Sequence, residues 1–311
     1  MKNAATFAEI NSLFANSEPE EVWLKASEIL GRINPEYDFS VVRTCFDDVV
    51  RLFHGEYPGY APIQTLYHDL RHTLDVFLCA VRLMHGLHVS GTRLSDDEMT
   101  IIMIAALMHD VGYAQPHGEE TGTGAQYTKS HVRRGIEFAR HYIAARGLAP
   151  GLAAPMESIL LCTDPAVAIP GIEFPDERIR LLGQIVGTAD LTGQMADRTY
   201  LEKLLFLYLE FKEARFGGYQ NIHDLLWKTR DFYELTRKKL DTGLGGIYNN
   251  LTFHFKDWYG VDNNYYLESI EKNIAYLSRV TALEKARQLS MLKRGGIVEK
   301  SETLIAPEDL A

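Results

Sequence analysis

The chain has 311 residues, of which 46% are hydrophobic and 24% are charged, and its formal net charge is −10. This composition is typical of a globular protein that is long enough to bury a sizeable core. The negative charge argues against binding to nucleic-acid polymers, because phosphate contacts require a basic surface. A small anionic substrate is compatible with it, since the local field at a site can oppose the net charge.

The cysteines and the apolar runs indicate the compartment. Cys45, Cys79 and Cys162 lie far apart and form no CxxC pair, which favours packed thiols in a reducing environment. The first residues, MKNAATFAEINS, lack the apolar run of a signal peptide, and the densest apolar run, at 99–108, is too short to span a bilayer. We therefore expect a cytoplasmic protein that does not insert into a membrane.

Hydrophobic residues recur at helical spacing along almost the whole chain. In chain order, the predicted helices cover residues 17–33, 37–53, 70–87, 95–110, 129–146, 152–162, 176–195, 198–214, 221–240 and 263–293. The helix from 95 begins with a capping box that joins Ser95 to Glu98. Residues 114–128 have the composition of a loop.

The same pattern predicts an all-α fold in one continuous domain, because strand signals are scarce and no internal repeat is present. We expect a helical bundle with additional helices at both ends. Residues 1–58 form an N-terminal support layer, 59–215 the core that carries the chemistry, 216–293 a C-terminal helical extension and 294–311 a loose tail.

The stretch YHDLRHTLDV, which begins at Tyr67, places two histidines one helical turn apart. Residues at i and i+4 lie on the same face of a helix, so the rings of His68 and His72 can reach a shared pocket. This spacing is weak evidence by itself, because core and surface helices also carry histidine.

A second candidate is the pair His109 and Asp110, which ends the apolar run IIMIAALM. An ionised Asp beside a His is costly to bury unless a partner compensates its charge, and a divalent cation does so well. The alternative is an ordinary helix end that emerges into solvent at Asp110. A third candidate is Asp190 in IVGTADLTG, for which the alternative is a helix-ending residue that caps a turn with Thr192.

Together, His72, His109, Asp110 and Asp190 offer two imidazoles and two carboxylates from three helices. Mixed nitrogen and oxygen ligands suit Zn, Mn, Fe or Mg. The ordered set resembles the HD-domain metal-dependent phosphohydrolase superfamily. YHDLRHTLDV further resembles the YHNxxHAxDV motif of the class I cyclic nucleotide phosphodiesterases, and TADLTG resembles their ADLS segment. The resemblance covers roughly residues 60–215.

The resemblance implies a role for each matching residue. His72, His109, Asp110 and Asp190 would bind the first of two divalent metal ions, and Asp110 would bridge to the second. A metal-bound hydroxide would attack phosphorus, and His68 would donate a proton to the leaving oxygen, as a histidine near neutral pKa can.

The chain also departs from the phosphodiesterase pattern. Tyr113 stands where the family has the last histidine of HDxxH, and Asp69 replaces the asparagine of the first motif. The purine-binding QxxF motif is absent from the C-terminal third of the sequence. Metal chemistry is therefore better supported than recognition of a cyclic purine nucleotide.

Further residues remain candidates with open alternatives. His131 is either a ligand of the second metal or a surface residue at a helix start. Asp75 either orients a ring of the metal site or lies exposed. Arg133 and Arg134 are candidates for binding substrate phosphate, against the more frequent fate of a solvated basic face. The aromatic segment at 245–260 is either a stacking wall for a base or core packing, and packing is favoured.

The leading hypothesis is a metal-dependent phosphohydrolase that cleaves a small phosphate ester, with a phosphodiester such as a cyclic nucleotide favoured. The first alternative is an HD-type nucleotidase or phosphomonoesterase. The second is a regulatory or binding module that holds metal without turnover. The sequence leaves the metal, the substrate and the oligomeric state open.

Overall fold

The computed structural model describes residues 18–306 and 309, so residues 1–17 of the predicted support layer lie outside the described residues. The described part is α-helical and has no strand; one isolated bridge pairs Tyr60 with Pro116. This confirms the all-α prediction. Its α-helices are α2 (Pro19–Ile33), α3 (Ser40–His54), α4 (Leu70–Val89), α5 (Asp96–Met108), α6 (His131–Ala145), α7 (Pro150–Ala153), α8 (Met156–Leu160), α9 (Glu177–Ala196), α10 (Tyr200–Glu213), α11 (Ile222–Lys238), α12 (Leu251–Tyr259), α13 (Tyr265–Thr281), α14 (Lys285–Met291) and α15 (Ile297–Glu302).

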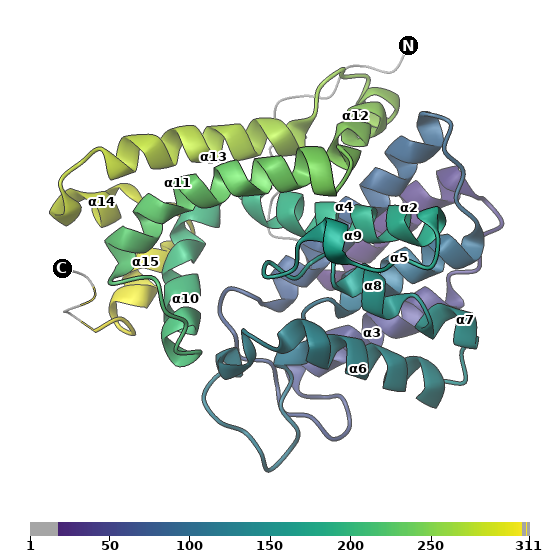
Figure 1. The fold of residues 1–311 in the computed structure, drawn as a ribbon, viewed down its shortest axis with the longest axis horizontal. Coiled ribbons are helices and arrows are strands. Elements are labelled where there is room, and N and C mark those ends of the chain that lie inside the picture. The colour runs from purple at the N-terminus through teal and green to yellow at the C-terminus, as the bar shows by residue number, and fades with distance from the viewer. Residues whose placement is uncertain (1–17, 307–308, 310–311) are drawn as a thin grey trace.

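The helices α4, α5 and α9 form the centre of the larger part of the molecule (Figure 1). The helix α4 packs against α2, α5, α9 and α12, and α5 also packs against α3. Every residue of α5 from Ile101 to Met108 is buried, as expected for a helix that is apolar all round. The predicted capping box is present: the Ser95 hydroxyl accepts from the Glu98 N–H, and the Glu98 carboxylate accepts from the Ser95 N–H.

The C-terminal helices form a second part, in which α11 and α13 run side by side and α10, α14 and α15 lie at one end (Figure 1). The predicted helix at 263–293 is divided, since α13 ends at Thr281 and α14 begins at Lys285. Part of the aromatic segment packs in the core: Phe255 of α12 is fully buried and its ring centroid lies 5.1 Å from that of Tyr265, while Phe253 is exposed. This agrees with the packing alternative.

The end of the chain differs from the loose tail that its composition predicts. It contains the helix α15, which packs against α10. The reason is apolar burial, because Ile297, Val298 and Ile305 are all covered. Asp309 also accepts a hydrogen bond of 2.8 Å from the hydroxyl of Tyr208.

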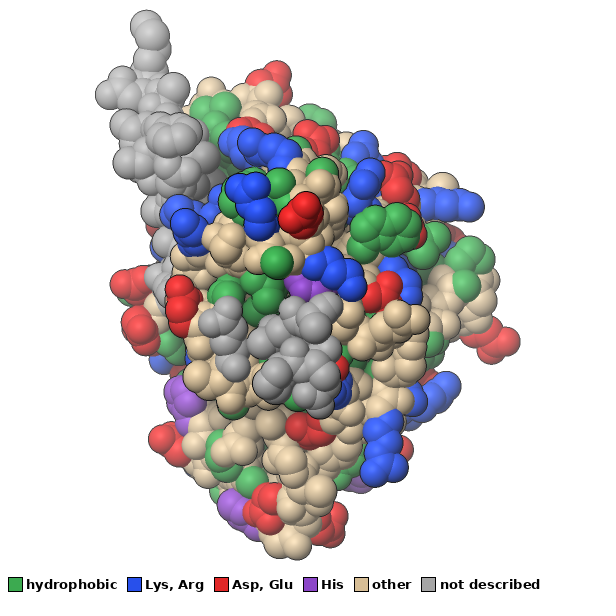
Figure 2. Space-filling view, turned by 90° about the vertical axis from the view of Figure 1, so that its left-hand side faces the viewer, with side chains coloured by type: hydrophobic (Ala, Val, Ile, Leu, Met, Phe, Trp, Pro, Cys, Tyr) green, Lys and Arg blue, Asp and Glu red, His purple; other side chains and the backbone are tan. Residues whose placement is uncertain are grey.

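The surface over the C-terminal helices carries basic, acidic and hydrophobic side chains intermingled (Figure 2). It differs from the uniformly basic surface that is typical of nucleic-acid-binding proteins. Among the described residues, no helix combines the length and the apolar character that crossing a bilayer would require.

Candidate metal centre and active site

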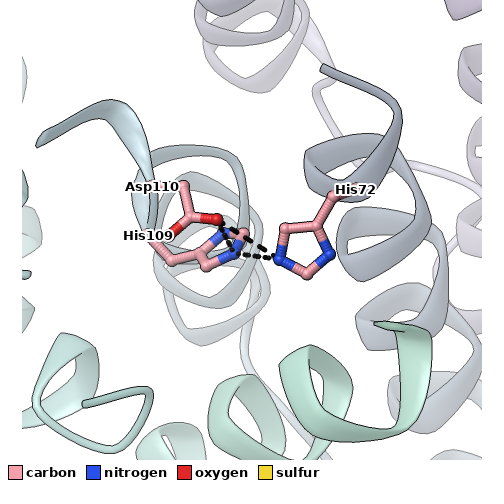
Figure 3. A group of neighbouring side chains, drawn as sticks. All are labelled: His72, His109 and Asp110. Carbon is pink, nitrogen blue, oxygen red and sulfur yellow. Dashed lines mark hydrogen bonds and ion pairs between the residues drawn. The ribbon is translucent and has the colours of Figure 1, made fainter. Parts of the chain in front are cut away.

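Three side chains from two helix ends converge on one point (Figure 3). His72 lies in the first turn of α4, where the carboxylate of the N-cap residue Asp69 accepts from the His72 N–H at 2.8 Å. His109 is the C-cap of α5 and Asp110 follows it. The Nε2 atoms of His72 and His109 are 3.1 Å apart. The Asp110 Oδ2 atom lies 3.3 Å from the first and 3.1 Å from the second.

Asp190 joins this group from α9. Its Oδ1 atom lies 3.4 Å from Nε2 of His72 and 3.8 Å from Nε2 of His109. The alternative that Asp190 ends a helix is wrong, because α9 continues to Ala196. The Gln194 amide, one turn later, donates to Asp190 Oδ1 at 3.3 Å and accepts from the Tyr67 hydroxyl at 2.6 Å. These contacts hold the carboxylate toward the two rings.

The chemistry of the group fits a divalent metal ion. Asp110 Oδ2 is buried and has no hydrogen-bond partner among the described residues. His109 Nδ1 donates to the Ala106 carbonyl at 2.8 Å, so the lone pair of the neutral ring lies on the inward-facing Nε2. Donor atoms that bind one ion at about 2.0–2.2 Å lie about 3–3.5 Å from one another. The spacing of these atoms therefore suits a shared cation.

The electrostatics also favour positive charge at this point. Burial opposes a charged His72 ring, but the carboxylates of Asp110 and Asp190 raise the pKa of His72 to about 10. Burial is likewise outweighed at Asp110, where the neighbouring histidines hold its pKa well below the usual range. A proton on His72 neutralises only part of the negative charge of the two carboxylates, and a divalent ion neutralises all of it.

The comparison with known families agrees with this geometry. Residues 69–190 match the family model of the HD domain. The chain contains an HD domain. The match begins at the N-cap of the helix that holds His72 and ends at Asp190, so it spans the whole group of four. HD domains bind divalent metal ions and are typically metal-dependent phosphohydrolases. No curated protein matches the chain.

His131 places a third imidazole next to the group of four side chains described above. Its Nε2 atom lies 3.5 Å from Oδ1 of Asp110, on the oxygen that the first two rings do not approach. Its Nδ1 donates to the Thr128 carbonyl at 2.8 Å, which again leaves the lone pair on Nε2 in the neutral ring. This position is compatible with a second metal ion bridged by Asp110. His131 is buried, which excludes the alternative that it is a surface residue at a helix start.

Gly112 explains how His131 comes so close. A Cβ atom at Gly112 would lie 1.9 Å from the backbone oxygen of His131. Only glycine therefore lets the 3-10 turn η1 (Val111–Tyr113) pack directly on the first turn of α6. The sequence HDVG thus carries packing information that sequence analysis missed.

His68 is held by a residue that sequence analysis also missed. Glu210 of α10 is buried and accepts from the N–H groups of Tyr67 and His68 through Oε1, at 2.6 and 3.3 Å. Its Oε2 atom lies 2.6 Å from His68 Nδ1. Burial opposes charge on the ring, but Glu210 and Asp110 together raise the pKa of His68. Glu210 lies outside the matched HD residues, in the helix that the sequence predicts at 198–214.

Tyr113 occupies the space between two histidines. Its ring is stacked on His68 at 4.9 Å and on His131 at 4.7 Å between centroids. Its hydroxyl is buried and has no hydrogen-bond partner among the described residues. The residue that departs from the HDxxH pattern therefore packs within the site.

The remaining predicted residues lie elsewhere. Arg134 donates to the carbonyls of Gly112 and Ala114 at 2.7 and 2.6 Å, and Arg133 is exposed. Neither lines the pocket next to the cluster, and their assignment to substrate phosphate stays a prediction. Asp75 lies 3.6 Å from Arg71, across a cavity of about 10 Å³ from His72, and the structure gives no hydrogen bond between Asp75 and that ring.

A pocket of about 380 Å³ opens next to the cluster and is lined by residues of the HD domain and of the helices α10 and α11. Its inner end is lined by His68, Asp110, His131 and Asp190. Two lysines also line it, Lys228 and Lys239. The pocket is large enough for a small organic phosphate.

Proposed function

We propose that this chain is a metal-dependent phosphohydrolase whose favoured substrate is a phosphodiester such as a cyclic nucleotide or a similar small ester. The observation that carries the proposal is the convergence of His72, His109, Asp110 and Asp190 at one buried point of an HD domain. A second divalent ion between Asp110 and His131 is part of the proposal. Bound divalent ions would activate water and neutralise charge on the phosphate.

The proposal gives each nearby side chain a task. His68 holds a proton at Nε2 and donates it to the leaving oxygen, while Glu210 fixes the other nitrogen. Lys239 supplies positive charge: its Nζ atom donates to the Asp164 carbonyl at 3.1 Å and it lines the pocket. Burial lowers the pKa of Lys239, which the Asp190 carboxylate opposes. Lys239 begins a π-helical turn, a feature common at functional sites.

A phosphomonoesterase is the first alternative, because the same ions and the same acid serve both ester classes. Initial rates on cyclic phosphodiesters, linear phosphodiesters and phosphomonoesters, each with added Mn or Mg, separate the two. The second alternative is a regulatory or binding module that binds metal and does not catalyse hydrolysis. It predicts bound metal and no hydrolysis of any ester in the panel.

The metal site itself is tested by substitution. We expect the purified wild-type chain to retain divalent metal, and His109→Ala and Asp110→Ala to lose it, because each removes a ligand atom. Elemental analysis after gel filtration measures the metal, and circular dichroism checks the fold. His68→Gln is the control: it should keep the metal but lower kcat by about 100-fold or more. Folded Ala variants that retain the wild-type metal content would contradict the site.

A further inference from the structure

The pocket beside the metal centre changes character along its length. Beyond the charged inner end, most of the lining side chains from α10, α11 and the turn between them are apolar. Phe211 and Phe216 are stacked at 4.8 Å, and Phe211 and Tyr219 at 5.3 Å between ring centroids. Phe232 and Leu235 of α11 continue this wall. We call these five residues the aromatic wall.

The aromatic wall is open to ligand, and its side chains are unusually exposed for their type. Phe216 is 40% exposed, Phe232 38% and Leu235 69%. Large apolar side chains left exposed together mark a binding surface more often than isolated ones do. The backbone supports this arrangement, because Arg215, at φ 49°, is the only non-glycine residue with positive φ in the described part of the chain. That costly conformation places Phe216 over Phe211.

Three polar side chains that line the pocket, Lys228, Thr229 and Gln194, make hydrogen bonds within the protein. Lys228 donates to the Asp224 carboxylate at 2.8 Å and to the Gly218 carbonyl at 2.6 Å. Thr229 donates to the Leu225 carbonyl at 2.8 Å. The Gln194 amide donates to Asp190 and accepts from the Tyr67 hydroxyl. These side chains are therefore held by the protein itself, and the exposed surface beside them is that of the aromatic wall.

We propose that the aromatic wall binds the organic group of the substrate through apolar contact, so that the enzyme prefers phosphate esters of apolar alcohols. The proposal rests on the proposed function, because the phosphate must lie at the charged inner end for the organic group to reach the wall. It narrows the substrate class, because the aromatic wall offers an alkyl or aryl group the same apolar contact that it offers the face of a base.

The test measures binding, so that it does not depend on turnover. Methyl-, butyl- and octylphosphonate are titrated by calorimetry into the Mn-loaded wild-type chain and two variants. One variant, Phe216→Ala/Phe232→Ala, truncates the aromatic wall. The other, Trp227→Ala, truncates a side chain that is 57% exposed on the same helix but does not line this pocket.

In the wild type, affinity should rise from methyl- to octylphosphonate by about tenfold or more, since each buried methylene contributes up to about fourfold. The double variant should lose most of this gain and still bind methylphosphonate as the wild type does. Trp227→Ala should behave as the wild type.

Affinity that is independent of chain length, or an equal loss in Trp227→Ala, would overturn the proposal. So would a nucleoside 5′-phosphate that binds more than about tenfold tighter than octylphosphonate, because such preference requires hydrogen bonds to polar groups. The two proposals fail separately. If no ester is hydrolysed, the proposed function fails, and the dependence of affinity on chain length still tests the role of the aromatic wall. If esters are hydrolysed but affinity does not depend on chain length, only the proposal for the aromatic wall is overturned.

Discussion

At the scale of the residue, the pair His68 and Glu210 determines which protonation state the candidate acid holds. A general acid is effective only in its protonated form. The buried carboxylate at 2.6 Å raises the pKa of the His68 ring above its ordinary value, against the effect of burial. The ring therefore keeps its proton to higher pH than a free histidine does.

Glu210→Gln removes the negative charge but keeps the size of the side chain. The pKa of His68 should then fall, and the alkaline limb of the pH profile of kcat should move to lower pH. Initial rates between pH 5 and 9 measure the shift. Glu213→Gln is the control, since Glu213 lies on the same helix and accepts from Thr123. An unmoved limb in a folded Glu210→Gln enzyme would show that His68 is not the acid.

At the scale of the element, the site depends on how closely η1 approaches α6. Gly112 makes the close approach possible. Arg134 of α6 stabilises it by donating hydrogen bonds to the carbonyls of Gly112 and Ala114. Arg134 also lies over the Tyr127 ring, with 3.7 Å between the guanidinium carbon and the ring centroid. The contact between η1 and α6 is therefore what brings His131 to Asp110.

Gly112→Ala should push α6 away from η1, because the added Cβ atom meets backbone and not a flexible side chain. We expect a loss of about 1–3 kcal/mol in the free energy of unfolding, together with weaker metal retention. Urea denaturation and elemental analysis measure the two effects. Gly31→Ala is the matched control: it lies within α2 with nothing within 4 Å of its added Cβ, and should stabilise by about 0.5–1 kcal/mol. Equal effects at both glycines would refute the close-approach argument.

At the scale of the whole molecule, Asp197 connects the HD domain to the C-terminal helices. It follows α9, is buried, and lies 3.2 Å from the Lys203 ammonium of α10 and 3.5 Å from the Arg71 guanidinium of α4. Its backbone oxygen accepts from Asn273 of α13 at 2.9 Å. Burial would raise the pKa of Asp197, but Lys203 and Arg71 outweigh burial and lower it.

Because folding lowers the pKa of Asp197, its ion pairs stabilise the protein fully above the unfolded pKa of about 3.9, and this contribution is lost as pH falls below that value towards the lower pKa of the folded state. Asp197→Asn leaves the buried Lys203 charge poorly compensated and should cost roughly 3 kcal/mol at pH 7. Urea denaturation of both proteins at pH 7 and pH 3 should show the difference shrinking at the lower pH. Asp262→Asn, at an exposed ion pair with Lys256, should change stability little. A difference that is constant with pH would contradict the assignment.

The sequence by itself determined most of the local structure and named the candidate residues of the metal centre. Helical periodicity and caps act over a few residues, so the helices and the box at Ser95 could be read directly. The set His72, His109, Asp110 and Asp190 could be named because its motif pattern resembles that of HD domains. Only the tertiary structure decided that these atoms converge, that Glu210 holds His68, and that Arg134 turns to a backbone carbonyl. Periodicity shows which face of a helix is buried, but the neighbour on that face depends on how all the helices pack.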